Sequence, residues 1–122
     1  TTLHGFSLSH AAPEQLDPGR FGTTTQQTDI YQLGIIWYWL VCGTQPFSAG
    51  SIAEATRERL EGEVVPPSAR VPGIELLDPV ILRCLARNPS ERYRDMREFL
   101  KDILDLETRL GGKNGGAGTG NA

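Results

Sequence analysis

The most informative segment of the sequence is residues 28–41, which read TDIYQLGIIWYWLV. From residue 30 onward this segment is apolar on almost every face, and it contains the aromatic run Trp37–Trp39. Its β-branched and aromatic content would also suit a strand, but its length, its Thr-Asp start and Gly43 just beyond its end favour a helix. Because a helix that is apolar all round is buried all round, we expect this helix at the centre of the fold.

Two helices are predicted after this central one. Ser51 and Glu54 form a capping-box pattern, which predicts a helix over residues 51–61. Asp78-Pro79 predicts the start of another helix, because proline is favoured at the first helical position. The residues expected to face the core are Ile52, Ala55, Thr56 and Leu60 in the first of these helices, and Ile81, Leu82 and Leu85 in the second.

A last helix is predicted from Asp95 onward, where Asp95 and Glu98 provide the cap. Its apolar residues recur at helical spacing along one stripe, namely Met96, Phe99, Leu100, Ile103 and Leu104. Residues 1–27 and 63–73 are rich in proline and glycine and are expected to form long ordered loops. The sequence therefore predicts a mainly α fold with about four helices.

The domain is expected to span residues 1–107, and residues 108–122 are expected to form a flexible tail. Six of the 14 glycines lie in the last twelve residues, which contain no large apolar side chain. Such a segment buries too little apolar surface to offset the entropy lost on ordering. The chain begins at Thr1 and not at methionine, so we expect either a processed chain or a piece of a longer one.

Composition and charge exclude several classes of protein. Twelve basic and fifteen acidic residues give a net charge of −3, which argues against a nucleic-acid binder. The apolar run of residues 33–42 is far shorter than the roughly 20 residues that a membrane span needs, so no span is expected. Cys42 and Cys84 have no paired spacing, and each lies among apolar residues. We expect both to be reduced core residues of a cytoplasmic protein.

Searches for general catalytic and metal-binding motifs find nothing. The sequence contains no G-x-G-x-x-G, no G-x-x-x-x-G-K, no H-E-x-x-H and no G-x-S-x-G. His4 and His10 are the only histidines, which is too few for a clustered metal site. The sequence by itself therefore contains no complete active site.

Four short motifs follow one another in a distinctive order. They are A-P-E at residues 12–14, T-D-I-Y-Q-L-G at 28–34, G-T-Q-P-F at 43–47 and C-L-A-R-N-P-S-E-R-Y at 84–93. In this order and at these gaps, they resemble the C-terminal half of the eukaryotic-type Ser/Thr protein kinase domain, over residues 4–107. The family pattern reads A-P-E, S-D-[IV]-[YW]-S-[LF]-G, G-x-x-P-F and L-x-x-[DN]-P-x-x-R. The resemblance implies the lower part of the kinase C-lobe.

The resemblance also assigns roles to four residues. It implies that Glu14 and Arg92 pair inside the fold, although they are 78 residues apart. It implies that Asp29 accepts hydrogen bonds from the backbone of the catalytic loop and holds the shape of that loop. The alternative is that Asp29 only caps its own helix. Gly34 is expected to let another backbone or side chain approach the central helix closely, and the resemblance implies that it supports the catalytic loop together with Asp29.

Ser7 is the candidate for contact with the substrate. The family pattern G-T-x-x-Y-x-A-P-E falls on residues 6–14. Ser7 therefore retains the hydroxyl that, in Ser/Thr-specific members of the family, bridges the catalytic carboxylate and the catalytic-loop lysine. Phe6 stands where the family has glycine, and His10 stands where it has tyrosine. These two departures leave open the conformation of this loop and the substrate preference.

The motifs of the first half of the kinase domain are missing: the Gly-rich loop, the β-strand lysine, H-R-D and D-F-G. We therefore expect no cofactor in this chain and no activity from it alone. The parent protein is expected to use ATP and Mg²⁺ to phosphorylate protein Ser/Thr hydroxyls. The expected partners are a peptide substrate and the N-terminal part of the kinase domain. The alternative is a non-catalytic, kinase-like interaction module that binds partners through the helix of residues 51–61 and its neighbouring loops.

Overall fold

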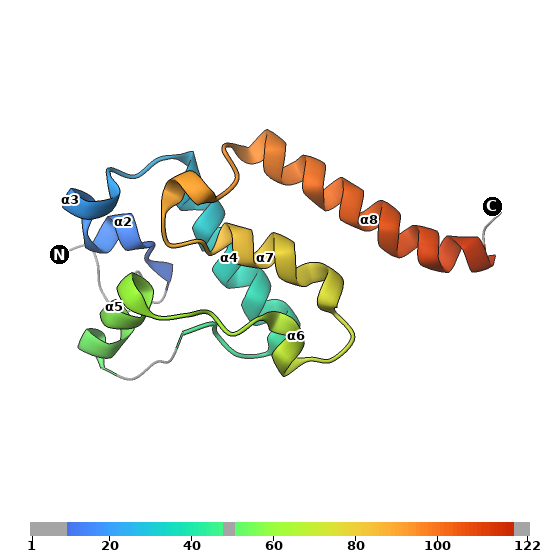
Figure 1. The fold of residues 1–122 in the computed structure, drawn as a ribbon, viewed down its shortest axis with the longest axis horizontal. Coiled ribbons are helices and arrows are strands. Elements are labelled where there is room, and N and C mark those ends of the chain that lie inside the picture. The colour runs from blue at the N-terminus through green and yellow to red at the C-terminus, as the bar shows by residue number, and fades with distance from the viewer. Residues whose placement is uncertain (1–9, 48–50, 119–122) are drawn as a thin grey trace.

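The structure, a computed structural model, describes residues 10–47 and 51–118, and their side chains as far as residue 111. No strand occurs within these ranges, and the predicted mainly α fold is confirmed. The helices are arranged along the chain as shown in Figure 1. They are α2 (Pro13–Leu16), α3 (Pro18–Phe21), α4 (Gln26–Cys42), α5 (Ile52–Glu61), α6 (Pro67–Arg70), α7 (Asp78–Cys84) and α8 (Met96–Gly118), with 3-10 helices at Glu75–Leu77 and Pro89–Glu91.

The four predicted helices correspond to α4, α5, α7 and α8. The three short helices α2, α3 and α6 have four residues each and lie in segments expected to be loops. Each of them begins with a proline, namely Pro13, Pro18 and Pro67. Proline at the first helical position has a φ angle suited to a helix and lacks only an N–H group that would be unbonded there. A single helical turn is therefore compatible with the same prolines that prevent a long helix.

Helix α4 begins two residues before the Thr-Asp start expected from the sequence, and its N-cap is Thr25. The Gln27 backbone N–H donates to Thr25 Oγ1 over 3.1 Å, and the Thr25 N–H donates to Thr28 Oγ1 over 3.0 Å. At the other end, Gly43 has a φ of 74° and donates its N–H to the Trp39 carbonyl. Glycine adopts this left-handed conformation without steric cost, so the helix ends where the sequence predicts.

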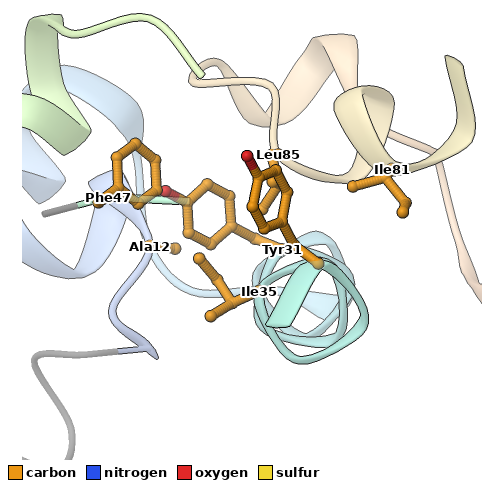
Figure 2. Packing of buried hydrophobic residues seen from close by; sticks show 7 residues of the cluster. Ala12, Tyr31, Ile35, Phe47, Ile81 and Leu85 are labelled. Carbon is orange, nitrogen blue, oxygen red and sulfur yellow. The ribbon is translucent and has the colours of Figure 1, made fainter. Parts of the chain in front are cut away.

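The core forms where α4 packs against α6, α7 and α8. One cluster of buried apolar side chains, seen in Figure 2, consists of Ala12, Tyr31, Ile35, Tyr38, Phe47, Ile81 and Leu85. A second cluster lies toward α8 and consists of Ile30, Val80, Cys84, Tyr93, Phe99 and Leu106. Helices α4 and α7 contribute to both clusters, so the central position predicted for residues 28–41 is confirmed.

The expectation that this helix is buried on every face is wrong. Leu33, Ile36 and Trp39 are each at least 40% exposed, and Leu40 is 76% exposed. These residues recur at helical spacing and therefore form one apolar face of α4, which we call the open face. The sequence pattern correctly indicates an apolar side chain at each position, but no described element covers the open face.

The stripe predicted for the last helix is only partly buried. Phe99 is buried and contacts the rings of Trp37 and Tyr93, whereas Leu100 and Leu104 are exposed. The physical reason is the helix face: Phe99, Ile103 and Leu106 follow the i, i+4, i+7 spacing and pack in or against the second cluster, whereas Leu100 and Leu104 lie on a neighbouring face that no described element covers. Beyond these contacts, α8 extends away from the other helices (Figure 1). Helix α8 continues to Gly118, through residues 108–118, where the sequence predicts a flexible tail. The domain boundary at residue 107 stays a prediction.

The capping box of α5 is present as predicted. The Glu54 backbone N–H donates to Ser51 Oγ, and the Ser51 N–H donates to Glu54 Oε1. The predicted apolar face of this helix is wrong at its first position, because Ile52 is 73% exposed. Ala55 and Arg59 are the buried residues of α5. One of the two buried side chains of α5 is therefore charged, and a pattern of apolar residues does not predict it.

Candidate functional site: the buried Glu14–Arg92 pair

The 3-10 helix Pro89–Glu91 places Arg92 at its end. Asn88 caps this helix, because its Oδ1 accepts from the Ser90 N–H and from Ser90 Oγ. Pro89 occupies the first position, and the chain becomes extended at Arg92. The N-P-S-E-R sequence therefore folds locally into a capped turn, and the Arg92 side chain that follows it is buried in the protein.

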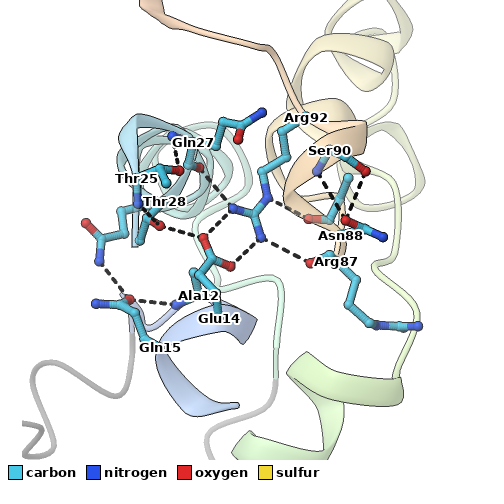
Figure 3. Close-up of polar contacts among 12 residues, drawn as sticks. Ala12, Glu14, Gln15, Thr25, Gln27, Thr28, Arg87, Asn88, Ser90 and Arg92 are labelled. Carbon is cyan, nitrogen blue, oxygen red and sulfur yellow. Dashed lines mark hydrogen bonds and ion pairs between the residues drawn. The ribbon is translucent and has the colours of Figure 1, made fainter. Parts of the chain in front are cut away.

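All five N–H groups of the Arg92 guanidinium are donated, as Figure 3 shows. Two of them form a bidentate pair with Glu14, from Nη1 to Oε2 at 2.7 Å and from Nη2 to Oε1 at 2.8 Å. The other three go to the carbonyl oxygens of Ala86, Arg87 and Gln27, at 2.7–3.1 Å. Both charged side chains are completely buried, with 0% of each exposed. The guanidinium also lies 4.7 Å from the centre of the Tyr31 ring.

Glu14 lies in α2, on the A-P-E segment, and its carboxylate accepts a third hydrogen bond. Thr28 Oγ1 donates to Glu14 Oε2 over 2.6 Å. Burial by itself would raise the pKa of Glu14, but the hydrogen bonds from Arg92 and Thr28 and the charge of Arg92 outweigh it and lower the pKa. Glu14 is therefore ionised at neutral pH, and the pair joins α2, the start of α4 and the corner after α7.

Two further contacts hold the A-P-E segment in place. Gln15 Oε1 accepts from the Ala12 N–H at 2.8 Å and from Gln32 Nε2 at 3.1 Å, which joins α2 to α4. Arg59 Nε donates to the Ala11 carbonyl at 3.0 Å and joins the same segment to α5. Sequence analysis missed Thr28 and Arg59. Thr28 lies next to Asp29 in a matched motif, so its position in the motif could have marked it as a candidate. Nothing in the sequence indicates that Arg59 is buried against the A-P-E segment.

Asp29 lies in the first turn of α4, and its side chain is exposed. Within the described part of the chain, no hydrogen bond or ion pair involves its carboxylate. The N-cap of α4 is Thr25, so the alternative that Asp29 caps its own helix is wrong. With Gln15, Thr25 and Gln32, Asp29 lines a small surface hollow of about 340 Å³. The structure thus places Asp29 apart from the Glu14–Arg92 pair, on the outside of α4.

Gly34 lies at a close contact between α4 and α7. A Cβ atom at this position would lie 2.7 Å from Cys84 Cβ and 3.1 Å from Leu85 Cδ2, which is closer than carbon atoms pack. The close approach expected at Gly34 is therefore present, and the approaching segment is α7. Whether Gly34 also supports the catalytic loop, as the family resemblance implies, stays a prediction.

Ser7, the candidate substrate contact, lies outside the described residues. No group of three or more possible metal ligands occurs among the residues that the structure describes. In the same part of the chain, no helix combines the length and the apolar character needed to cross a bilayer. Cys84 is buried, which raises its pKa to about 12, and Cys42 is half-buried.

Comparison with known proteins identifies related kinases. No protein-family model matches the chain. The Ser/Thr protein kinase PknB of Mycobacterium tuberculosis (strain H37Rv) is 32% identical over 99 residues, which cover 80% of this chain and 15% of that kinase. PknB of Mycobacterium leprae is 32% identical over 103 residues, which cover 84% and 16%. PknL of Mycobacterium tuberculosis (strain CDC 1551) is 32% identical over 105 residues, which cover 85% and 26%.

The chain thus spans only about a sixth to a quarter of the length of these relatives. The aligned 80–85% of the chain is long enough to include most of the matched motifs. The buried Glu14–Arg92 pair joins the first and last of those motifs in space. Over 80–85% of its length the chain is thus homologous to Ser/Thr protein kinases, and its motifs, from A-P-E to the last helices, match the C-terminal half of the kinase domain.

Proposed function

We propose that this chain is the C-terminal portion of a Ser/Thr protein kinase and serves as the platform that supports the catalytic loop and docks the peptide substrate. The observation that carries this proposal is the open face of α4, where Leu33, Ile36, Trp39 and Leu40 are exposed. Asp29 lies beside this face, and its carboxylate has no partner among the described residues. An apolar helix face normally packs against another element. An acceptor-only carboxylate at its N-terminal end suits backbone N–H donors from that element.

The missing element is, in this proposal, the N-terminal part of the same kinase domain. It would bring ATP, Mg²⁺ and the residues that orient the substrate hydroxyl. The described residues provide no cluster of carboxylates for a magnesium ion, so no step of phosphoryl transfer is assigned to them. Their contribution is positional, because the Glu14–Arg92 pair fixes the A-P-E segment next to the start of α4, where Asp29 lies. A cytoplasmic location and a protein substrate belong to the same proposal.

The test extends the chain upstream of Thr1 as its coding sequence directs, and compares the extended protein with the 122-residue chain. We expect the extended protein to contain H-R-D and D-F-G and to transfer phosphate from ATP–Mg²⁺ to Ser/Thr peptides. The 122-residue chain should transfer none and should give no Mg²⁺-dependent, one-to-one heat in calorimetric titration with ATP. An upstream sequence without these motifs, or an extended protein without transfer, contradicts the proposal.

A second candidate function is a non-catalytic interaction module that uses α5. The observation in its favour is Ile52, a large apolar side chain that is 73% exposed in the first turn of that helix. Capture of a protein partner that is lost in Ile52→Asp, from an extended chain without H-R-D, would support the module. Phosphate transfer that Ile52→Asp leaves unchanged would support the kinase.

A further inference from the structure

A second site lies between α4, α5 and α7. It is a pocket of about 330 Å³, and Tyr31, Phe47, Arg59, Leu82, Leu85 and Arg87 are among the residues that line it. This volume is near the lower end of the range of small-molecule sites. Its described lining includes none of the five residues discussed above as kinase site residues, which are Ser7, Glu14, Asp29, Gly34 and Arg92.

Two buried polar atoms of the pocket residues lack a hydrogen-bond partner in the described structure. They are the Tyr31 hydroxyl oxygen and Arg87 Nε. Buried polar groups in folded proteins are nearly always bonded, so each exception calls for a specific explanation. Tyr38 and Tyr93 provide a contrast, because their hydroxyls donate to the Val65 carbonyl and to Asp102 at 2.7 Å. Among the three tyrosines, Tyr31 is thus the one whose hydroxyl has no hydrogen-bond partner in the described structure, and Tyr31 lines the pocket.

Both unmet groups are able to donate a hydrogen bond, and the charges around them favour an anion. Near Tyr31, the carboxylate of Glu14 is neutralised by its bidentate pair with Arg92. The guanidinium of Arg87 lies beside the Gly62 carbonyl, to which its Nη2 donates. Arg59 also lines the pocket, and its guanidinium carries a positive charge over the Phe47 ring at 4.9 Å.

The remaining lining residues restrict the kind of anion. Glu63 and Glu91 place two carboxylates at the pocket, which disfavour a doubly charged ligand such as phosphate. Phe47, Leu82 and Leu85 provide apolar walls, which favour a ligand with an apolar body. A carboxylate group has two acceptor oxygens and no donor, and therefore matches two unmet donors.

We propose that this pocket binds a small organic monocarboxylate, whose oxygens accept hydrogen bonds from the Tyr31 hydroxyl and Arg87 Nε and whose apolar body lies against Phe47 and Leu85. The site is separate from phosphoryl transfer and does not depend on the kinase proposal. A bound carboxylate would contact α4, α5 and α7 at once, and would therefore stabilise the packing of the three helices.

The experiment titrates the 122-residue chain with benzoate, with neutral benzamide and with inorganic phosphate, and follows backbone amide shifts by NMR. We expect saturable benzoate binding, with the largest shifts at residues 31, 62 and 87, and weaker binding of both other probes. Tyr31→Phe should weaken benzoate binding about tenfold or more, as expected for one lost hydrogen bond to a charged group. The matched variant Tyr93→Phe removes a hydroxyl outside the pocket and should leave the affinity within about twofold, well inside a tenfold step.

Arg87→Lys gives a second variant that keeps the positive charge but lacks Nε, and we expect it to weaken benzoate binding as well. Circular dichroism checks that each variant is folded. Absence of saturable benzoate binding overturns the proposal, and so does equal binding of benzamide. Equal affinity of Tyr31→Phe and the wild type overturns the assigned role of the hydroxyl. Phosphate that binds more tightly than benzoate overturns the choice of a monocarboxylate.

Discussion

Removal of either member of the Glu14–Arg92 pair should destabilise the protein strongly. The pair is completely buried, and it is the one described ion pair in which neither side chain is exposed. In Arg92→Ala, the Glu14 carboxylate keeps only the hydrogen bond from Thr28 and loses both bonds from the guanidinium. In Glu14→Ala, the guanidinium keeps its three carbonyl acceptors but loses its counter-charge.

The magnitude follows from this burial. Breaking a buried pair by removing one partner costs about 3–5 kcal/mol, because a buried charge is left uncompensated. Arg92→Ala should lie at the upper end of that range, since three carbonyl oxygens lose a donor as well. The double variant should cost clearly less than the sum of the two single changes, because either change alone already abolishes the interaction.

The assay is urea unfolding of the wild type, both single variants and the double variant, followed by tryptophan fluorescence. A fixed concentration of trimethylamine oxide in all samples ensures that weakened variants start folded. The matched control is the exposed pair of Arg109 and Asp105, whose side chains are 61% and 56% exposed. Arg109→Ala should cost about 0–1 kcal/mol, as is typical of exposed pairs.

Two results would refute this reasoning. One is a cost for Arg92→Ala no larger than the cost for Arg109→Ala, which would mean that burial adds nothing to the pair. The other is a double variant whose cost equals the sum of the single costs, which would mean that Glu14 and Arg92 do not interact energetically.

Three further perturbations have expected outcomes. Because the pKa of Glu14 is lowered in the folded protein, the ionised carboxylate stabilises the fold fully above pH 4.5, the ordinary pKa of the group. This contribution to the free energy of unfolding is lost as the pH falls through the lowered pKa. Urea melts of Glu14→Gln and of the wild type should therefore converge in acid. Gly34→Ala should destabilise the protein by about 1–3 kcal/mol, because the added Cβ atom would overlap α7. Gly111→Ala, where a Cβ atom meets open space, should stabilise it by about 0.5–1 kcal/mol. Equal thermal melts of the two variants would contradict both expectations. Tyr93→Phe strands the Asp102 carboxylate and should cost about 1–3 kcal/mol in the same melts, and no cost would show that this bond is immaterial.

Much of the fold could be predicted from local sequence signals. The helix ends at Gly43, Ser51 and Asp95 are encoded by residues within one turn of each end, and all three are present in the structure. The Glu14–Arg92 contact is different, because no local rule joins residues 78 positions apart. It was predicted from the resemblance to the kinase family, which fixes the order of the motifs.

The sequence could not predict which apolar helix faces are covered by other elements and which stay exposed. The apolar pattern of α4 is the same whether a face is covered or open, so Leu40 was assigned to the core although it is exposed. The pattern of α8 likewise includes Leu104 in the apolar stripe, but it does not show that the buried face runs through Phe99, Ile103 and Leu106 and leaves Leu100 and Leu104 exposed. The buried position of Arg59 depends on the Ala11 carbonyl, which only tertiary packing brings close.

The most direct measurement of the proposed function is the turnover of the extended kinase with Asp29→Asn. Asp29 is exposed and unpaired within the described chain, so the substitution should hardly change the stability of the 122-residue chain. If Asp29 holds the catalytic loop, kcat should fall about 100-fold, as expected when reacting groups are misplaced by about 1 Å, with little change in the KM for ATP. Asp105→Asn, on an exposed face of α8, should leave kcat unchanged. A kcat for Asp29→Asn equal to that of Asp105→Asn would contradict the account.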